Sequence, residues 1–152
     1  MSNVTIVNED LLEANLDIIG HQVNGLGIMS GGIALQIKKR YPLVYKEYKK
    51  ICNPLLPKKN LGKCQVVSTQ IGDDKYIANL FGQAHVGFGV QTKYDALEES
   101  LRELKEYARE RGLSVGLPYM IGCGLAGGDW NKVQLIIEEV FSDYPVTICK
   151  LD

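Results

Sequence analysis

The sequence has few of the residues from which metal and cofactor sites are built. It contains two histidines, and its four cysteines are widely spaced with no Cys-x-x-Cys pair, so neither a zinc site nor a disulfide framework is predicted. No glycine-rich turn continues into the Gly-Lys-Ser/Thr of a Walker A loop, and Ser30 stands where a dinucleotide fingerprint would require glycine. We therefore expect no metal and no cofactor.

Long apolar runs and a strong net charge are also absent. No apolar run reaches the length of a membrane-spanning helix, and the start, Met1-Ser2-Asn3, lacks the basic-then-apolar layout of a signal peptide. A formal net charge of -1 gives no electrostatic reason for tight binding along a nucleic-acid backbone, although a local basic patch of Lys38, Lys39 and Arg40 could still meet a phosphate. We expect a monomeric cytoplasmic protein with no membrane partner.

What the chain does have is the composition of an ordinary folded domain, with 152 residues of which 45% are hydrophobic. We expect one domain over residues 1–152. Strands are predicted at residues 4–7, 16–23, 63–69, 76–81, 114–117 and 146–151, with a hairpin turn at Gly72-Asp73-Asp74, and helices at 32–39, 42–52, 94–111 and 129–141. This order predicts an α/β sandwich with a mixed sheet, in which ligands gather beyond the carboxyl ends of central strands.

Two glycine-rich turns each leave a predicted strand and open a predicted helix. They are Gly25-Leu26-Gly27-Ile28-Met29-Ser30-Gly31-Gly32 and Ile121-Gly122-Cys123-Gly124-Leu125-Ala126-Gly127-Gly128. Glycine lets the backbone come close to a ligand, and a helix start offers unpaired N–H groups to an anion. The pair predicts a ligand with two phosphates, or a phosphate and a sugar, held between the turns. Cys123 is either a nucleophile, for which no histidine is near in sequence, or a small residue in a tight turn.

Several short motifs occur in a specific order along nearly the whole chain. They are Asn8-Glu9-Asp10-Leu11, His21-Gln22-Val23-Asn24, Met29-Ser30-Gly31-Gly32-Ile33-Ala34-Leu35-Gln36, Arg40-Tyr41-Pro42, Leu61-Gly62-Lys63, Asn79-Leu80-Phe81, and Leu117-Pro118 through Ile121-Gly122-Cys123-Gly124-Leu125 to Trp130. In this order the chain resembles a macrodomain, the ADP-ribose-binding fold. The resembling branch includes the terminal ADP-ribose protein glycohydrolase, the antitoxin that reverses DNA ADP-ribosylation, and the fungal ADP-ribose 1''-phosphate phosphatase. The resemblance implies a three-layer α/β/α fold with a mixed central sheet.

The resemblance also implies a role for each turn. Asp10 matches an aspartate that accepts a hydrogen bond from the adenine amino group; its alternative role is to cap the turn that follows it. The first turn would wrap the distal ribose and one phosphate, and the second would cradle the diphosphate. Trp130 would either stack on the ligand or pack in the core. The implied ligand-binding residues are Asp10, Leu11, Asn24, Gly31, Gly32, Ile33, Gly122, Cys123, Gly124, Leu125, Ala126 and Gly127.

Catalysis is where this sequence departs from the family. Lysine-dependent members of the branch use a lysine and an aspartate at positions that correspond to Gln83 and Ala126, and neither residue here can act as a nucleophile or base. His21 matches a histidine of the fungal phosphatase and is the catalytic candidate, with a buried structural histidine as the alternative. Asp129 is a second candidate, or the cap of the last helix. His85 and a water oriented by the substrate's diphosphate complete the possibilities.

Two functions of different classes follow from this sequence. One is an enzyme that hydrolyses ADP-ribose conjugates, either the 1''-phosphate or an ADP-ribosyl group attached to protein or nucleic acid. The other is a non-catalytic module that reads or sequesters ADP-ribose. The partners expected are ADP-ribose or an ADP-ribosylated protein or nucleic acid.

Overall fold

The computed structural model describes residues 3–70 and 75–151 and contains a six-stranded sheet with the order β1-β6-β5-β2-β4-β3. The strands are β1 (Val4–Val7), β2 (Ile18–Val23), β3 (Cys64–Ser68), β4 (Tyr76–Phe81), β5 (Val115–Pro118) and β6 (Val146–Cys149). The helices are α1 (Gly32–Arg40), α2 (Pro42–Ile51), α3 (Tyr94–Arg111) and α4 (Trp130–Val140). The predicted α/β architecture with a mixed sheet is confirmed.

The sheet is parallel except at one edge. The pairs β1·β6, β6·β5, β5·β2 and β2·β4 are parallel, whereas β3 pairs antiparallel with β4. The antiparallel pairing is that of the predicted hairpin, and its turn at residues 72–74 lies outside the described residues. Central strand β2 is buried along nearly its whole length, as parallel strands between two helix layers are.

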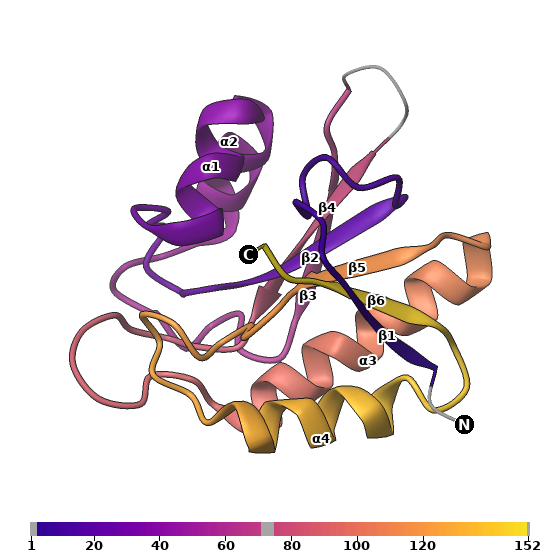
Figure 1. Cartoon of the computed structure of the whole chain (residues 1–152). Helices are drawn as coiled ribbons and strands as arrows, with labels where there is room; N and C mark the ends of the chain where they lie inside the picture. Colours follow the sequence, from indigo (N-terminus) through magenta and orange to yellow (C-terminus); the bar gives the residue numbers. More distant parts are fainter. Residues whose placement is uncertain (1–2, 71–74, 152) are drawn as a thin grey trace.

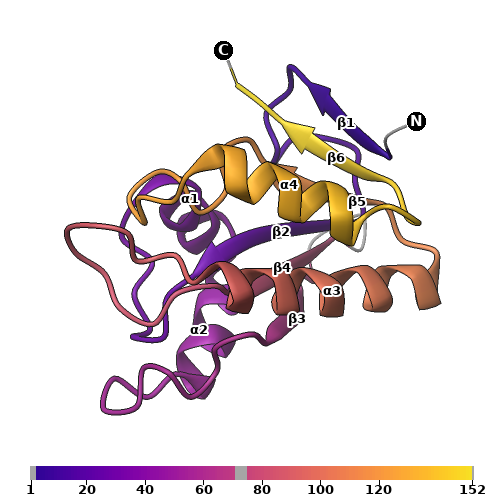
Figure 2. The ribbon, with the colours of Figure 1, turned by 90° about the horizontal axis from the view of Figure 1, so that it is seen from below.

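Helices cover both faces of the sheet, which gives the three layers that the resemblance implies (Figure 1). α1 and α2 lie on one face, where Val44 and Tyr48 of α2 are fully buried. α3 and α4 pack side by side on the other face (Figure 2), with Leu97, Leu101 and Leu104 of α3 in the larger core cluster. α3 ends at Gly112, whose φ of 66° only glycine adopts without strain.

Three strands are shorter than the sequence predicts, β3 by one residue at each end and β2 and β6 by two residues at one end. β2 starts at Ile18 because the preceding Asp17 binds its carboxylate to the backbone N–H and the hydroxyl of Ser114, which fixes the chain before the ladder begins. β6 ends at Cys149 because its edge neighbour β1 is four residues long, and Lys150 donates its N–H to Val7 at the end of that neighbour.

The parallel strands place their carboxyl ends at the same edge of the sheet. The loops that leave β2, β5 and β4 therefore gather there, on the left in Figure 1. The first two are the glycine-rich turns, and the third runs from Gly82 to Lys93. This edge is where the sequence predicts the ligand.

Candidate functional site

A cleft of about 940 Å³ lies between these three loops. That volume suits a ligand of dinucleotide size. The lining residues come from the ends of β2 and β5, both turns, the start of α1 and the loop after β4: Gln22, Val23, Asn24, Ile28, Ser30, Gly31, Gly32, Ile33, Ala34, Gln83, Val86, Gly87, Phe88, Gly89, Val90, Pro118, Tyr119, Met120, Ile121, Gly122, Gly124, Leu125, Ala126 and Gly127. The structure thus brings nine of the twelve sequence-predicted ligand residues together.

Asn24 builds the first turn rather than presenting its side chain to the cleft. Its Oδ1 accepts the backbone N–H groups of Leu26 and Ile28, and its Nδ2 donates to the carbonyl oxygen of Ile28. The hydroxyl of Tyr48 on α2 contacts both the backbone carbonyl oxygen and Oδ1 of the same asparagine as a donor. Both ends of the amide are therefore engaged, and Asn24 acts by fixing the shape of the turn.

The first turn leads directly into the amino terminus of α1. Gly31 is the N-cap residue, and no side chain among the described residues caps this helix start. The first intrahelical bond is made by the N–H of Leu35 to the Gly31 carbonyl, so the N–H groups of the preceding helical residues Gly32, Ile33 and Ala34 are left for a ligand. All three line the cleft, and an anion there would meet the positive end of the helix dipole.

The second turn faces the first across the cleft. A Cβ at Gly31 would lie 2.7 Å from Cδ1 of Leu125, so the two turns approach each other closely. Gly122 and Gly127 have φ values of 75° and 70°, which favour glycine. A Cβ at Gly124, in contrast, would meet no atom within 4 Å, so this glycine keeps open the space in front of the turn.

A network of side-chain amides ties the three loops together. Gln22 Nε2 donates to Gln83 Oε1 (2.8 Å) and to the Thr92 hydroxyl (2.9 Å), which in turn donates to the Gly122 carbonyl. Gln83 is oriented by its own donation to the carbonyl of His85. Gln22 Oε1 is buried with no hydrogen-bond partner, so an acceptor next to the cleft is available to a hydroxyl or a water.

The third wall of the cleft, Val86 to Val90, is absent from the sequence-predicted set. Phe88 at its tip is fully exposed and stands between Gly87 and Gly89, both with positive φ. The sequence signal was present as apolar residues alternating with glycine in a loop, a pattern that a core segment would not have. Met120, another unpredicted lining residue, has a φ of 64°, and such backbone strain clusters at ligand sites.

Three predicted ligand residues lie outside the cleft lining. Asp10 Oδ1 accepts the N–H of Leu12, which is the capping role named as its alternative, while its adenine contact stays a prediction. Leu11 is buried in the core beneath α1. The thiol of Cys123 contacts the Ile121 carbonyl, and burial together with the charge of Asp129 raises its pKa to about 11. A thiol with that pKa is protonated at neutral pH, so the alternative of a small residue in a tight turn fits better than a nucleophile.

His21 is fully buried in β2 and is not among the residues that line the cleft. Its Nε2 donates to Asn79 Oδ1 (2.6 Å), since the Asn79 amide nitrogen is committed to Gln65. Burial lowers the pKa of His21 to about 4 against the opposing effect of the Asn79 hydrogen bond. The imidazole is therefore neutral at physiological pH, and its predicted catalytic role has no contact with the cleft to support it.

Asp129 and Trp130, each predicted with two alternative roles, also find structural partners. Asp129 accepts the N–H of Asn131 and so caps α4, as one of its two interpretations predicts. Trp130 packs against Tyr119 with ring centroids 5.1 Å apart, at the border of the core.

Within residues 3–70 and 75–151, no three His, Cys, Asp or Glu side chains gather as a metal site would require. No helix in this part of the chain is long and apolar enough to cross a membrane.

Comparison with known proteins gives consistent matches. The family model described as Macro domain matches residues 21–137. The chain is 33% identical over 144 residues to the DNA ADP-ribosyl glycohydrolase of Mycobacterium tuberculosis, covering 93% of this chain but 40% of that longer protein. It is 28% identical to the ADP-ribose 1''-phosphate phosphatase of Saccharomyces cerevisiae, over 99% of this chain and 100% of that protein. The solved macrodomain of Mycobacterium tuberculosis DarG superposes with a TM-score of 0.82 and 32% identity, over 97% of this chain and 96% of that one.

Proposed function

The chain belongs to the Macro domain family, and we propose on that premise that it binds ADP-ribose in the cleft and hydrolyses an ADP-ribose conjugate. The observation that carries the proposal is the pair of glycine turns facing each other across the cleft, one of them continuing into the uncapped start of α1. Backbone N–H groups from both sides suit a diphosphate. Both relatives described above are named as hydrolases of ADP-ribose derivatives.

The strand order supports one orientation of the ligand. Asp10 follows β1 at one end of the sheet, and the loop carrying Gln83 and Phe88 follows β4 near the other end, with the second and first turns between them. With adenine at Asp10, the diphosphate falls at the second turn and the distal ribose at the first. The bond to be broken then lies beside Gln83 and Phe88.

The chemistry must be done without a charged side chain in the cleft. Among the described residues that line it, none is a carboxylate, a histidine or a lysine. A diphosphate oxygen of the substrate can orient a water and take its proton, while Gln22 holds Gln83 and Thr92 in place in the wall of the cleft. The water oxygen then bonds to the anomeric carbon of the distal ribose. The phosphate, or the protein or nucleic-acid group that was attached to this carbon, leaves with the electron pair of the broken bond.

A non-catalytic reader is the second candidate, and a specific observation favours it. Gln83 and Ala126 stand where the resemblance to lysine-dependent macrodomains implies a reactive pair, and the histidine candidate, His21, is fully buried within β2. A domain that only binds needs the turns and not these groups.

Incubation with three substrates separates the two candidates. The protein is mixed with ADP-ribose 1''-phosphate, mono-ADP-ribosylated protein and ADP-ribosylated DNA, and the products are identified by mass spectrometry. We expect release of ADP-ribose from at least one conjugate, and Gln22→Ala should lower that turnover by about 10-fold to 100-fold while ADP-ribose affinity stays within a few-fold. If all three substrates remain intact although ADP-ribose binds, the protein is a reader.

A further inference from the structure

Positive charge is concentrated in one part of the chain. Nine of its 17 lysines and arginines lie between residues 36 and 63, together with one of its 18 acidic residues, Glu47. This segment comprises most of α1, all of α2 and the loop that leads to β3. The net charge of -1 for the whole chain hides this asymmetry.

Six lysines of this segment are here called the basic face: Lys38, Lys46, Lys49, Lys50, Lys58 and Lys59. Lys46, Lys49 and Lys50 are exposed on α2, and the Cβ atoms of Lys49 and Lys50 lie about 5–6 Å from that of Lys46, one helical turn earlier. The ammonium groups of Lys38 and Lys49 approach the Tyr45 ring from α1 and α2, at 4.4 and 5.6 Å from its centroid.

The basic face adjoins the first glycine turn. The Tyr45 hydroxyl donates to the carbonyl of Gly27, and a Cβ at Gly27 would lie 3.8 Å from Cγ of Lys49. The loop that carries Lys58 and Lys59 packs its Pro57 carbonyl against Gly25. The face therefore begins where the cleft ends, behind the turn assigned to the distal ribose.

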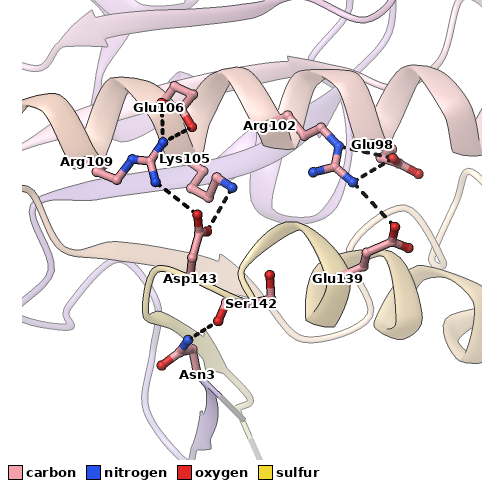
Figure 3. A network of polar contacts seen from close by, with 9 residues as sticks. All are labelled: Asn3, Glu98, Arg102, Lys105, Glu106, Arg109, Glu139, Ser142 and Asp143. Atoms are coloured by element: carbon pink, nitrogen blue, oxygen red, sulfur yellow. Dashed lines mark hydrogen bonds and ion pairs between the residues drawn. The ribbon is translucent and has the colours of Figure 1, made fainter.

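Several cations on the opposite face of the sheet are held in ion pairs, whereas five of the six lysines of the basic face form none within the described residues. On α3 and α4, Arg102 bridges Glu98 and Glu139, and Asp143 holds both Lys105 and Arg109 (Figure 3). On the basic face, Lys50 pairs with Glu47, and no ion pair of the other five lysines occurs among the described residues. Solvated lysines on a stripe of this spacing suit a partner with regularly repeated negative charge.

We propose that the basic face docks the nucleic-acid strand to which the ADP-ribosyl group is attached, an inference that rests on the proposed function. A strand joined to the distal ribose leaves the cleft at the first turn and passes over Lys49 and the stripe of α2. Its phosphates replace the counterions of the lysines, so binding weakens with salt. Tyr45 offers an aromatic ring at the centre of this path.

The test measures binding of a fluorescently labelled single-stranded DNA of about 20 nucleotides without ADP-ribose, as a function of salt. The variant Lys46→Gln/Lys49→Gln/Lys50→Gln removes three exposed charges from the stripe. The matched control, Arg109→Gln/Arg111→Gln/Lys132→Gln, removes three exposed charges from α3 and α4. Thermal unfolding with and without ADP-ribose is recorded for each protein, to check folding and the cleft independently.

We expect the stripe variant to lose about 10-fold or more in DNA affinity and the slope of log affinity against log salt to fall by about 2, because each phosphate contact on a single strand contributes about 0.7. The control should stay within about twofold of the wild type, and all three proteins should gain the same thermal shift from ADP-ribose. Equal DNA binding by both variants would overturn the proposal. So would tighter binding to polyglutamate or to phosphatidylserine vesicles than to DNA, since the face would then serve an acidic protein or a membrane. If ADP-ribose does not raise the melting temperature of the wild type, the proposed function is wrong, while the result on DNA binding remains valid.

Discussion

Single glycines set the shape of the cleft in different ways. At Gly127 a Cβ would lie 2.7 Å from the carbonyl oxygen of Gly89, so this glycine allows the second turn to pack on the third loop. Gly124 has open space in front of it. Gly127 is therefore required for packing of the fold, and Gly124 leaves room for a ligand.

Substitution of Gly124 should therefore separate folding from binding. Gly124→Glu places a carboxylate where the phosphates are expected, and we predict a loss of ADP-ribose affinity of at least about 100-fold, since like-charge contacts are worth several kcal/mol. Gly124→Ala is the matched control, which should bind within about threefold because its methyl group meets no atom. Titration calorimetry measures both. Unchanged affinity of the glutamate variant, with its circular dichroism intact, would show that this turn does not line the binding site.

His21 affects stability through its buried neutral ring. Because its pKa is about 4 in the fold and about 6.5 in the unfolded chain, the unfolded state binds more protons between these values. The stabilisation is complete above pH 6.5 and is lost as the pH falls towards 4, by up to about 3 kcal/mol. His21→Asn should remove this pH dependence from denaturant unfolding curves, and His85→Asn, which removes the other histidine, should keep it. If the unfolding free energy of His21→Asn decreases as much as that of the wild type when the pH is lowered, the assignment is wrong.

At the scale of single residues, the sequence predicted the glycines of the turns better than the surroundings of the buried polar side chains. Glycine positions follow from local conformational demands, so Gly31, Gly122 and Gly124 could be placed at the site before the structure was seen. The environment of His21 could not, because its hydrogen-bond partner Asn79 is 58 positions away and only the sheet register brings it opposite His21.

At the scale of elements, the three loops at the sheet edge form most of the cleft. The two turns are rigid, with Asn24 and the glycines fixing their shape, whereas the third loop exposes its apolar side chains. An exposed Phe88 has no role in the core. We assign it to covering the bound ligand at the end where the bond is broken.

Removal of that aromatic ring should weaken binding without affecting the fold. For Phe88→Ala we predict a loss of about threefold to tenfold in ADP-ribose affinity, the worth of one aromatic contact. The melting temperature of the free protein should not change, because Phe88 buries no surface in it. Leu135→Ala, which removes an exposed apolar side chain from α4, is the control and should bind like the wild type. An affinity unaltered by the loss of Phe88 would show that the loop stays away from the ligand.

The elements themselves were largely predictable, because each has a clear apolar period and a clear stop. α3 illustrates this, since Leu97, Leu101 and Leu104 repeat at helical spacing and Gly112 ends the helix. The amide network was not predictable. It joins Gln22 to Gln83 and Thr92, which are 61 and 70 positions further along the chain, and no local pattern signals such a contact.

At the scale of the whole molecule, the parallel order of five strands brings all ligand loops to one edge. The same arrangement segregates charge, because α1 and α2 carry lysines with no ion pair among the described residues, while Arg102, Lys105 and Arg109 of α3 are ion-paired on the other face. Composition could not reveal this segregation, since a nearly zero net charge is the sum of both faces. The cleft lies next to the basic face that we propose as a docking surface.

The central claim is that one cleft, formed by both glycine turns, binds a whole ADP-ribose molecule. Titration calorimetry with ADP-ribose, AMP and ribose 5-phosphate tests it most directly. Saturable one-to-one binding of ADP-ribose, with little heat from either fragment at the same concentration, is the predicted result, because each fragment reaches only half of the cleft. The absence of heat with ADP-ribose at high micromolar concentration would contradict the account.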